Sequence, residues 1–274
     1  MFWKRFTKNK VALVGLLFLS LEIAAGVCAP LLTGWDPVKL GLDKVLLNPG
    51  TEGHLLGTDE YGMDVWARLL YGARISLFIG FLVIGISLTI GVIMGSIAGY
   101  YGGWIDNVVM RLVDLLAAFP FFVLAISIMA VLGPGLFNVM IALGSVSWIG
   151  YARLTRAQFL SIKEKEFVES ARAEGCSDLY IVARHILPNA IAPVIVQATL
   201  GMGGAILSAS GLSFLGLGAQ PPTPEWGAML SAGQIYIRRS PHLSLYPGLA
   251  IMFTVLAFNF IGDGLRDSLD PRLR

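Results

Sequence analysis

Long stretches without a charged residue alternate with short polar segments along this chain. A helix needs about 20 mostly apolar residues to cross the ~30 Å hydrocarbon layer of a membrane. Six stretches meet that length, so the pattern predicts an all-α membrane protein with about six transmembrane helices. The predicted spans are 11–32, the stretch between Arg74 and Asp106, the two halves of 115–152 on either side of Gly133-Pro134-Gly135, a span that starts near Asn189, and 243–262.

The first span has two interpretations. A basic tip before an apolar stretch is typical of a secretory signal peptide and of an uncleaved transmembrane helix alike. Glu22 divides the apolar stretch and everything downstream is also membrane-like, so the uncleaved helix is favoured. An acidic side chain inside a span is by default a functional candidate. For Glu22 we favour a hydrogen bond to a neighbouring helix, or a neutral side chain, over a role in transport.

The composition supports a membrane protein and excludes several other classes. Hydrophobic residues make up 55% of the 274 positions and charged residues 14%, against about 25% in a typical soluble domain. The net charge of +2 is too balanced for a chain whose main partner is nucleic acid. Cys28 and Cys176 lie far apart in sequence and are too few for a disulfide framework or a four-ligand zinc site.

The placement of lysine and arginine predicts the orientation. Positive charge in short loops near span ends is retained on the cytoplasmic side. With a cytoplasmic N-terminus, fourteen Lys and Arg residues fall inside and six outside, and both termini are cytoplasmic. The opposite orientation reverses that bias, so we reject it.

The segment Lys163 to Pro188 is too polar to span a membrane and too regularly patterned for an unstructured loop. We predict two short amphipathic helices. Gly175 ends the first as a left-handed residue, and Ser177 caps the second, which Pro188 stops. The predicted apolar faces are Phe167, Val168 and Ala171 in the first helix and Leu179, Val182, Ala183 and Ile186 in the second. This elbow is either a connector on the membrane surface or a docking lever for a cytoplasmic partner, and its mixed charge favours the lever.

At these residues the chain resembles the permease subunits of binding-protein-dependent ABC importers. Their signature is Glu-(Ala/Ser)-Ala, three residues, Gly, and Leu-Pro twelve residues beyond that Gly. It stands here as Glu169-Ser170-Ala171, Gly175 and Leu187-Pro188. The longer run 166–175, with 184–189, is more specifically similar to the dipeptide, oligopeptide and nickel permeases.

Other motifs, in order along the chain, are similar to the second, "C-type", permease of such systems. They are Leu56-Gly57-Thr58-Asp59 with Tyr61-Gly62-Met63-Asp64, the run 213–218 with 221–227, and the tail 263–271. The chain departs from the family at two positions. Met63 stands where the family commonly has Arg, which puts in doubt what that Arg does in the outer segment. Ser170 replaces the more usual Ala, a small change in volume.

The resemblance implies a type I ABC importer permease fold, located in the cell (inner) membrane. The elbow then inserts into a cytoplasmic ATPase subunit, so that closure driven by ATP tilts the membrane helices. The implied partners are a paralogous permease, two ATPase subunits, an extracytoplasmic binding protein and the lipid bilayer. The residues expected to couple the ATPase to transport are Glu169, Ser170, Ala171, Gly175, Ser177, Asp178, Leu187 and Pro188.

We divide the chain into three parts: the tip and first helix, 1–32; an extracytoplasmic segment, 33–74; and a permease core, 75–274, with the coupling loop 161–188. The extracytoplasmic segment is expected to be a small folded lid with surface helices. We expect it to contact the binding protein and the partner permease; a solvated connector is the alternative.

The chain is not expected to be an enzyme or to bind a cofactor itself. No Gly-Lys-Ser/Thr occurs, so a phosphate-binding Walker A loop is absent and ATP with Mg²⁺ is left to the partner subunits. No metal site is expected, because His54 and His242 fall outside while His185 falls inside.

Polar and small residues within the spans suggest how the helices pack and where a solute passes. Gly91, Gly95 and Gly99 form a stripe that favours close approach of another helix. The candidate lining residues of the translocation path are Gln197, Thr199, Ser208 and Ser210. Hydrogen bonds between neighbouring helices explain these polar residues equally well.

The cargo is expected to be a di- or oligopeptide, with nickel or another small solute of the same family as the alternative. A secondary transporter would need an ion-coupling cluster inside the membrane, and Glu22 alone is poor support for one. A membrane enzyme would need clustered catalytic residues, and none is visible in the sequence.

Overall fold

The computed structural model describes residues 6–269, and within them every regular element is helical. Residues 270 and 271 of the tail motif lie outside this range. The helices are α2 (Lys10–Val27), α3 (Ala29–Leu32), α4 (Val65–Tyr101), α5 (Gly103–Ala117), α6 (Phe121–Leu132), α7 (Leu136–Ile162), α8 (Glu166–Ala173), α9 (Asp178–Tyr180), the π-helix η1 (Ile181–Ile186), α10 (Leu187–Phe214), α11 (Trp226–Gln234) and α12 (His242–Leu269).

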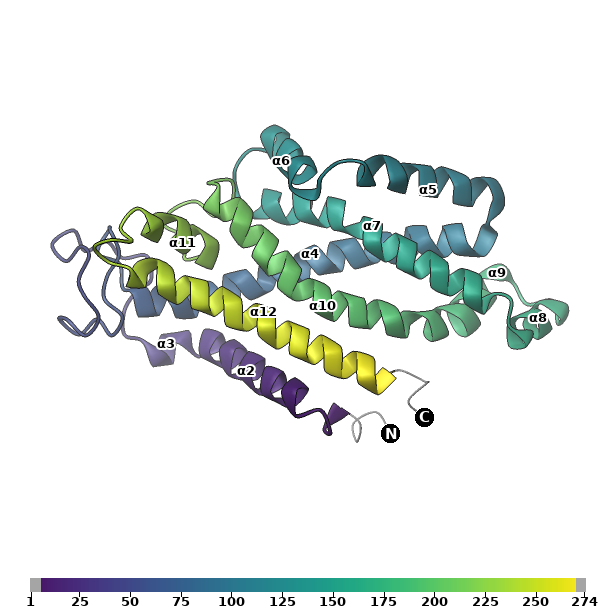
Figure 1. Ribbon diagram of the computed structural model, residues 1–274, viewed down its shortest axis with the longest axis horizontal. Coiled ribbons are helices and arrows are strands. Elements are labelled where there is room, and N and C mark those ends of the chain that lie inside the picture. Colours follow the sequence, from purple (N-terminus) through teal and green to yellow (C-terminus); the bar gives the residue numbers. More distant parts are fainter. Residues whose placement is uncertain (1–5, 270–274) are drawn as a thin grey trace.

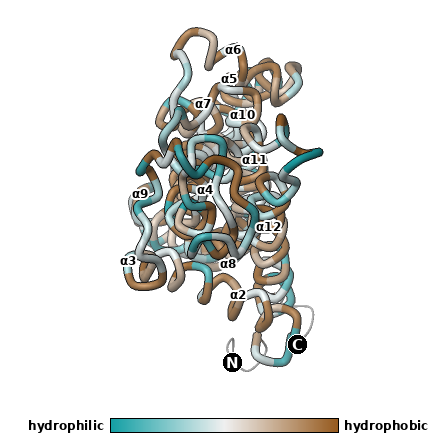
Figure 2. Tube along the Cα trace, turned by 90° about the vertical axis from the view of Figure 1, so that its left-hand side faces the viewer, coloured by the Kyte–Doolittle hydropathy of each residue, from teal (hydrophilic) through white to brown (hydrophobic). Residues whose placement is uncertain are grey.

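The long helices α4, α7, α10 and α12 run along the longest axis of the molecule, with α2 beside α12 (Figure 1). The start of α2, the end of α12 and the elbow helix α8 all lie at one end of this bundle (Figure 1). The connecting segment 33–64 lies at the other end. Figure 2 shows that the helices are predominantly hydrophobic, whereas hydrophilic residues gather in connecting segments.

The described chain contains four helices that are long and apolar enough to cross a membrane: α2, α4, α12 and the continuous helix Asp178–Phe214. The pair α5 and α6 makes a fifth if it counts as one crossing. The sequence pattern predicted about six. The remaining candidate, α7, has 27 residues but carries Arg153 and Arg156 in its second half, which lower its mean hydropathy.

The third predicted span is not one straight helix, and this corrects the sequence prediction. It is divided into α5 and α6, which meet at an angle of 89°. Pro120 stands at the break, directly before α6. Proline lacks an N–H and disfavours helical geometry at the preceding residue, so the chain turns here. The predicted turn at 133–135 is confirmed, with Gly133 and Gly135 both at positive φ.

The helices α4 and α7 pack along much of their length, as the glycine stripe predicted. A Cβ atom on Gly91 would collide with Tyr151, and one on Gly99 would lie 2.6 Å from Cβ of Phe159. Only glycine allows the two backbones to approach this closely.

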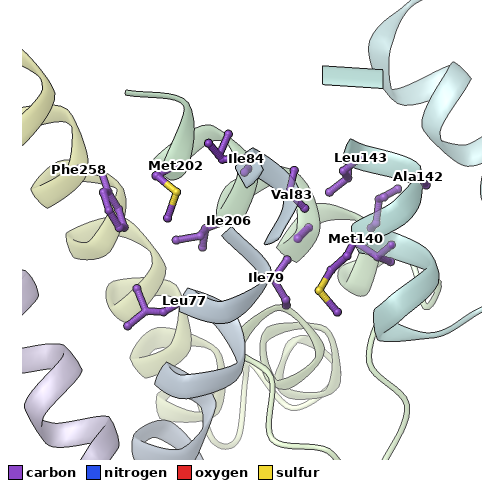
Figure 3. Close-up of a cluster of buried hydrophobic side chains, with 14 of the residues drawn as sticks. Leu77, Ile79, Val83, Ile84, Met140, Ala142, Leu143, Met202, Ile206 and Phe258 are labelled. Atoms are coloured by element: carbon purple, nitrogen blue, oxygen red, sulfur yellow. The ribbon is translucent and has the colours of Figure 1, made fainter. Parts of the chain in front are cut away.

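The central core lies between four of the long helices. Most of its buried side chains come from α4, α7, α10 and α12 and face one another (Figure 3), and α2 and α6 add Leu19, Ala125 and Met129. They include Leu77, Ile79, Val83, Ile84, Met140, Leu143, Met202, Ile206 and Phe258.

The segment 33–64 contains no helix, so the surface helices expected in this part of the chain are absent from it. Turns and two isolated bridges, Thr51 with His54 and Thr58 with Asp64, shape it instead. The helix α4 already begins at Val65, inside the segment assigned to 33–74. Asp64 fixes that start by accepting a hydrogen bond from the backbone N–H of Ala67 at 2.7 Å.

Candidate coupling elbow and translocation path

The first helix of the elbow, α8, buries one narrow face. Val168 and Ala171 are buried there. Phe167 was predicted to belong to the same face, but it is 44% exposed. Glu169 and Ser170 are exposed. The Ser170 hydroxyl donates to the Glu166 carbonyl, 2.9 Å away, so the helix itself satisfies the extra hydroxyl.

Gly175 ends α8 in the left-handed conformation, with φ of +81°, as predicted. Its N–H donates to the carbonyl of Arg172, and the N–H of Cys176 donates to that of Ala171, both at 3.1 Å. These two bonds satisfy the last carbonyls of the helix in a Schellman motif. Gly175 therefore sets the direction in which the chain leaves α8.

The second half of the elbow differs from the prediction. Pro188 does not stop the helix, because α9, η1 and α10 form one continuous helix, Asp178–Phe214. The turn before Pro188 is a π turn, in which the N–H of Leu187 donates to the carbonyl of Val182. This wider turn offers a way to fit the proline ring, and Pro188 lies in the first turn of α10. The elbow is thus rigidly continuous with a long helix.

Of the apolar face predicted for this second half, only Ile186 is fully buried. Leu179 is 78% exposed, Ala183 is exposed and Val182 is half-buried. The buried residues are Ile181 and Ile186, five positions apart. That spacing matches a π-helix rather than the α-helical period used for the prediction.

The hydroxyl of Ser177 does not cap the second helix, although Ser177 occupies the N-cap position. The polar contact at this turn is made by Asp178, whose Oδ1 accepts a hydrogen bond from the Tyr100 hydroxyl at 2.6 Å. Tyr100 belongs to α4, and the sequence offered no signal for this contact.

A hydrophobic cluster seats the elbow on the ends of the long helices. Buried residues of α4, α7, α8, η1 and α10 meet in it. They are Tyr100, Phe159, Val168, Ala171, Ile181, Ile186 and Ala190, with Leu187 packed against them. A force on the exposed side of the elbow therefore acts on several long helices together.

Two of the four predicted path residues lie in one cavity. Gln197 and Ser208 of α10 line a cavity of about 550 Å³ whose walls also come from α4, α7 and the bend between α5 and α6. Thr199 and Ser210 line neither this cavity nor the second one below. The Thr199 hydroxyl donates to the Ile195 carbonyl at 3.0 Å, and Ser210 is buried at a third, apolar pocket.

A second cavity, of about 610 Å³, lies between α7, α10 and the C-terminal part of α12. Gln197 lines both cavities, so they adjoin along the groove between α7 and α10. The second cavity is lined by Gln158, Asn189 and Arg266, which the sequence did not single out. Gln158 and Asn189 can donate and accept hydrogen bonds, whereas Arg266 only donates them and adds a positive charge.

Two family models match this chain. One is described as the binding-protein-dependent transport system inner membrane component and covers residues 91–274. The chain belongs to this family. The other, the N-terminal transmembrane domain of oligopeptide transport permease C, covers residues 1–49 of the permease. The elbow and the second cavity fall within the first match, and so do the residues lining the first cavity apart from Val83 and Ile84.

Similar relatives extend over the whole permease. It is 47% identical to the "Dipeptide transport system permease protein DppC" of Alkalihalophilus pseudofirmus, over 99% of this chain and 89% of that protein. It is 44% identical to the "Glutathione transport system permease protein GsiD" of Pectobacterium atrosepticum, over 100% and 91%. The MetNI methionine ABC transporter, solved in inward-facing conformations, contains a chain with the same fold: TM-score 0.57, 20% identity, covering 73% of this chain and 95% of that one.

At the opposite end from the elbow, Arg68 ties three segments of the permease together. Its guanidinium donates to the carbonyls of Pro37 and Pro222, each at 3.0 Å, and lies 3.3 Å from Asp59. Burial raises the pKa of Asp59, and Arg68 acts in the opposite direction. Met63, the departure from the family pattern, is 2% exposed, and its sulfur lies 3.0 Å from the same guanidinium. The family commonly has Arg at position 63, and in this chain Arg68 supplies a guanidinium group next to that position.

Among the described residues, His54 lies between an acidic and an aromatic side chain. Nδ1 of His54 lies 2.8 Å from Asp64, and Trp35 stacks on the imidazole at 4.2 Å between centroids. No group of three potential metal-binding side chains occurs within residues 6–269. This arrangement holds the segment 33–64 onto the start of α4.

Glu22 makes the contact between helices that the sequence favoured. Its Oε1 accepts a hydrogen bond from the Thr254 hydroxyl of α12 at 2.5 Å.

Glu22→Gln is expected to leave ATP-driven uptake within about twofold of wild type. Glutamine keeps an acceptor oxygen at that place, and a neutral hydrogen bond contributes only about 1 kcal/mol. Uptake by purified complexes in liposomes measures this. Lost uptake in a normally assembled complex would assign Glu22 a role in transport.

Proposed function

We propose that this permease forms half of the translocation path of an ABC importer for di- or oligopeptides. A paralogous permease supplies the other half, two cytoplasmic ATPase subunits bind and hydrolyse ATP with Mg²⁺, and an extracytoplasmic binding protein delivers the peptide. Both termini and the elbow are cytoplasmic. The observation that carries the proposal is the elbow, with its exposed Glu169 and Gly175, seated on the same long helices that enclose the two cavities.

The chemistry of the groove between α7 and α10 favours a peptide over nickel. Among residues 6–269, the side chains that line its two cavities include amides, hydroxyls and one arginine, but no His, Cys, Asp or Glu. Imidazole, thiolate and carboxylate are the side chains that bind nickel, and Arg266 repels a cation. Amides and hydroxyls instead match the backbone of a peptide, and Arg266 suits its carboxylate. The relatives named for dipeptide and glutathione transport agree with this cargo.

In the proposed cycle the elbow converts closure of the ATPase subunits into movement of the membrane helices. Because Asp178–Phe214 is one helix, tilting the elbow tilts Gln197 and Ser208 with it. The groove then opens alternately to the two sides of the membrane, and each transition is driven by ATP bound to the partner chains.

Co-purification of the tagged permease in mild detergent tests the assembly, and reconstitution tests the activity. We expect a second multi-span chain and ATP-binding subunits to purify with it. In liposomes, the complex with its binding protein should take up a labelled dipeptide only with ATP. The matched control is a complex whose ATPase subunits lack the phosphate-binding lysine of the Walker A loop. A permease that purifies alone and transports without ATP would overturn the proposal in favour of a secondary transporter.

A further inference from the structure

Tyr100 lies at the elbow end of α4, one residue before the end of that helix. Its side chain is only 9% exposed and belongs to the hydrophobic cluster beneath the elbow. Its hydroxyl donates to Oδ1 of Asp178, the first residue after the turn of the elbow, at 2.6 Å. A hydrogen bond to a carboxylate is shorter and stronger than one between neutral groups.

We infer that Tyr100 is a positioning residue that carries the movement of the elbow into α4. The inference rests on the proposed function. The elbow is joined covalently to α7 and α10, since it lies between them in the chain. Its connection to α4 is noncovalent, and the hydrogen bond from Tyr100 to Asp178 is a directional part of that connection, next to an interaction of Tyr100 with Arg172 of α8.

The connection matters because α4 forms part of the wall of the first cavity. Val83 and Ile84 line that cavity, and they belong to the same uninterrupted 37-residue helix as Tyr100. Between them and Tyr100, the glycine stripe holds α4 against α7. A shift of Asp178 is therefore transmitted along α4 to the cavity, while α4 and α7 move as a pair.

Tyr100→Phe tests this, because it keeps the buried ring and removes the hydroxyl. We expect peptide uptake per ATP hydrolysed to fall about three- to tenfold, with normal assembly and undiminished ATP hydrolysis. Tyr101→Phe is the matched control, because Tyr101 is the next residue, is 57% exposed and has no hydrogen bond to the elbow among those described. In this variant the ratio of peptide uptake to ATP hydrolysed should stay at the wild-type value. A role limited to folding would lower the yield of complex and leave the ratio unchanged.

A double-mutant cycle assigns the effect to the hydrogen bond. Asp178→Ala should lower the ratio by the same factor, and the double variant should show no further loss. A wild-type ratio in Tyr100→Phe, or losses that multiply in the double variant, would overturn the inference.

Failure of the proposed function gives a different result. If the wild-type complex shows no ATP-driven peptide uptake, the cargo or the importer assignment is wrong. Hydrogen exchange then tests the contact between Tyr100 and Asp178 by itself. Tyr100→Phe should speed the exchange of the backbone amides around Asp178, and Tyr101→Phe should not. Unchanged exchange in Tyr100→Phe would overturn the contact independently of transport.

Discussion

Replacing Gly175 with valine is expected to lower uptake per ATP hydrolysed by about tenfold while the complex still assembles. Gly175 has a φ of +81°, and a Cβ atom there would meet nothing within 4 Å. The cost is therefore conformational: a left-handed residue other than glycine is disfavoured by about 1–2 kcal/mol, with a β-branched residue at the unfavourable end. Since ~1.4 kcal/mol corresponds to tenfold, the equilibrium of the elbow should shift about tenfold away from the native geometry. Paired uptake and ATPase assays in liposomes measure this.

Gly175→Asn is the matched control, because asparagine tolerates the left-handed conformation and adds a side chain of similar size to that of valine. It should retain most of the coupling. If Gly175→Val coupled normally, the geometry of this turn would have no part in transmission and the elbow mechanism would be contradicted. An equal loss in both variants would indicate that the surface at Gly175 matters and not its backbone.

Filling the first cavity is expected to block transport more completely. Gly204 lines that cavity, and a Cβ atom on it would meet nothing within 4 Å. A phenyl ring can therefore enter the 550 Å³ space without disturbing the packing of α10. Gly204→Phe should reduce peptide uptake more than tenfold while the complex keeps its ATPase activity, as measured in the same liposomes.

Gly85→Phe controls for adding a large side chain at a glycine within a membrane helix. Gly85 lies on α4, has the same free space around a Cβ atom, is exposed and lines neither cavity. Its uptake should stay near the wild-type value. Normal uptake by Gly204→Phe would show that the peptide passes elsewhere, and the groove between α7 and α10 would lose its assignment.

The features of this permease that were predictable from sequence are local ones. The conformation of Gly175 followed from its place after an amphipathic helix, and the close approach of α4 and α7 followed from glycines four residues apart. Glu22 was expected to bond to a neighbouring helix, although Thr254 could not be named as its partner. Each prediction used residues within one or two turns of helix, where spacing alone determines which side chains share a face.

The predictions that failed treated proline and helical period as fixed rules. Pro120 does break a span, but its effect was not included in the prediction for 115–152. Pro188 was expected to end a helix, and a π turn carries the helix past it instead. That turn also changed which residues are buried, so that Ile181 replaced Leu179 in the cluster. The energy of a π turn depends on packing around it, which a linear pattern does not record.

The sequence by itself determined that this protein is a helical membrane permease with a polar elbow, because apolar length, charge placement and the elbow motif are properties of contiguous residues. Only the tertiary structure decided which polar groups act together. It brought Tyr100 to Asp178, separated Gln197 and Ser208 from Thr199 and Ser210, and added Arg266 to the groove. Contacts between residues far apart in the chain depend on how helices rotate and cross, and many side chains fix those angles jointly.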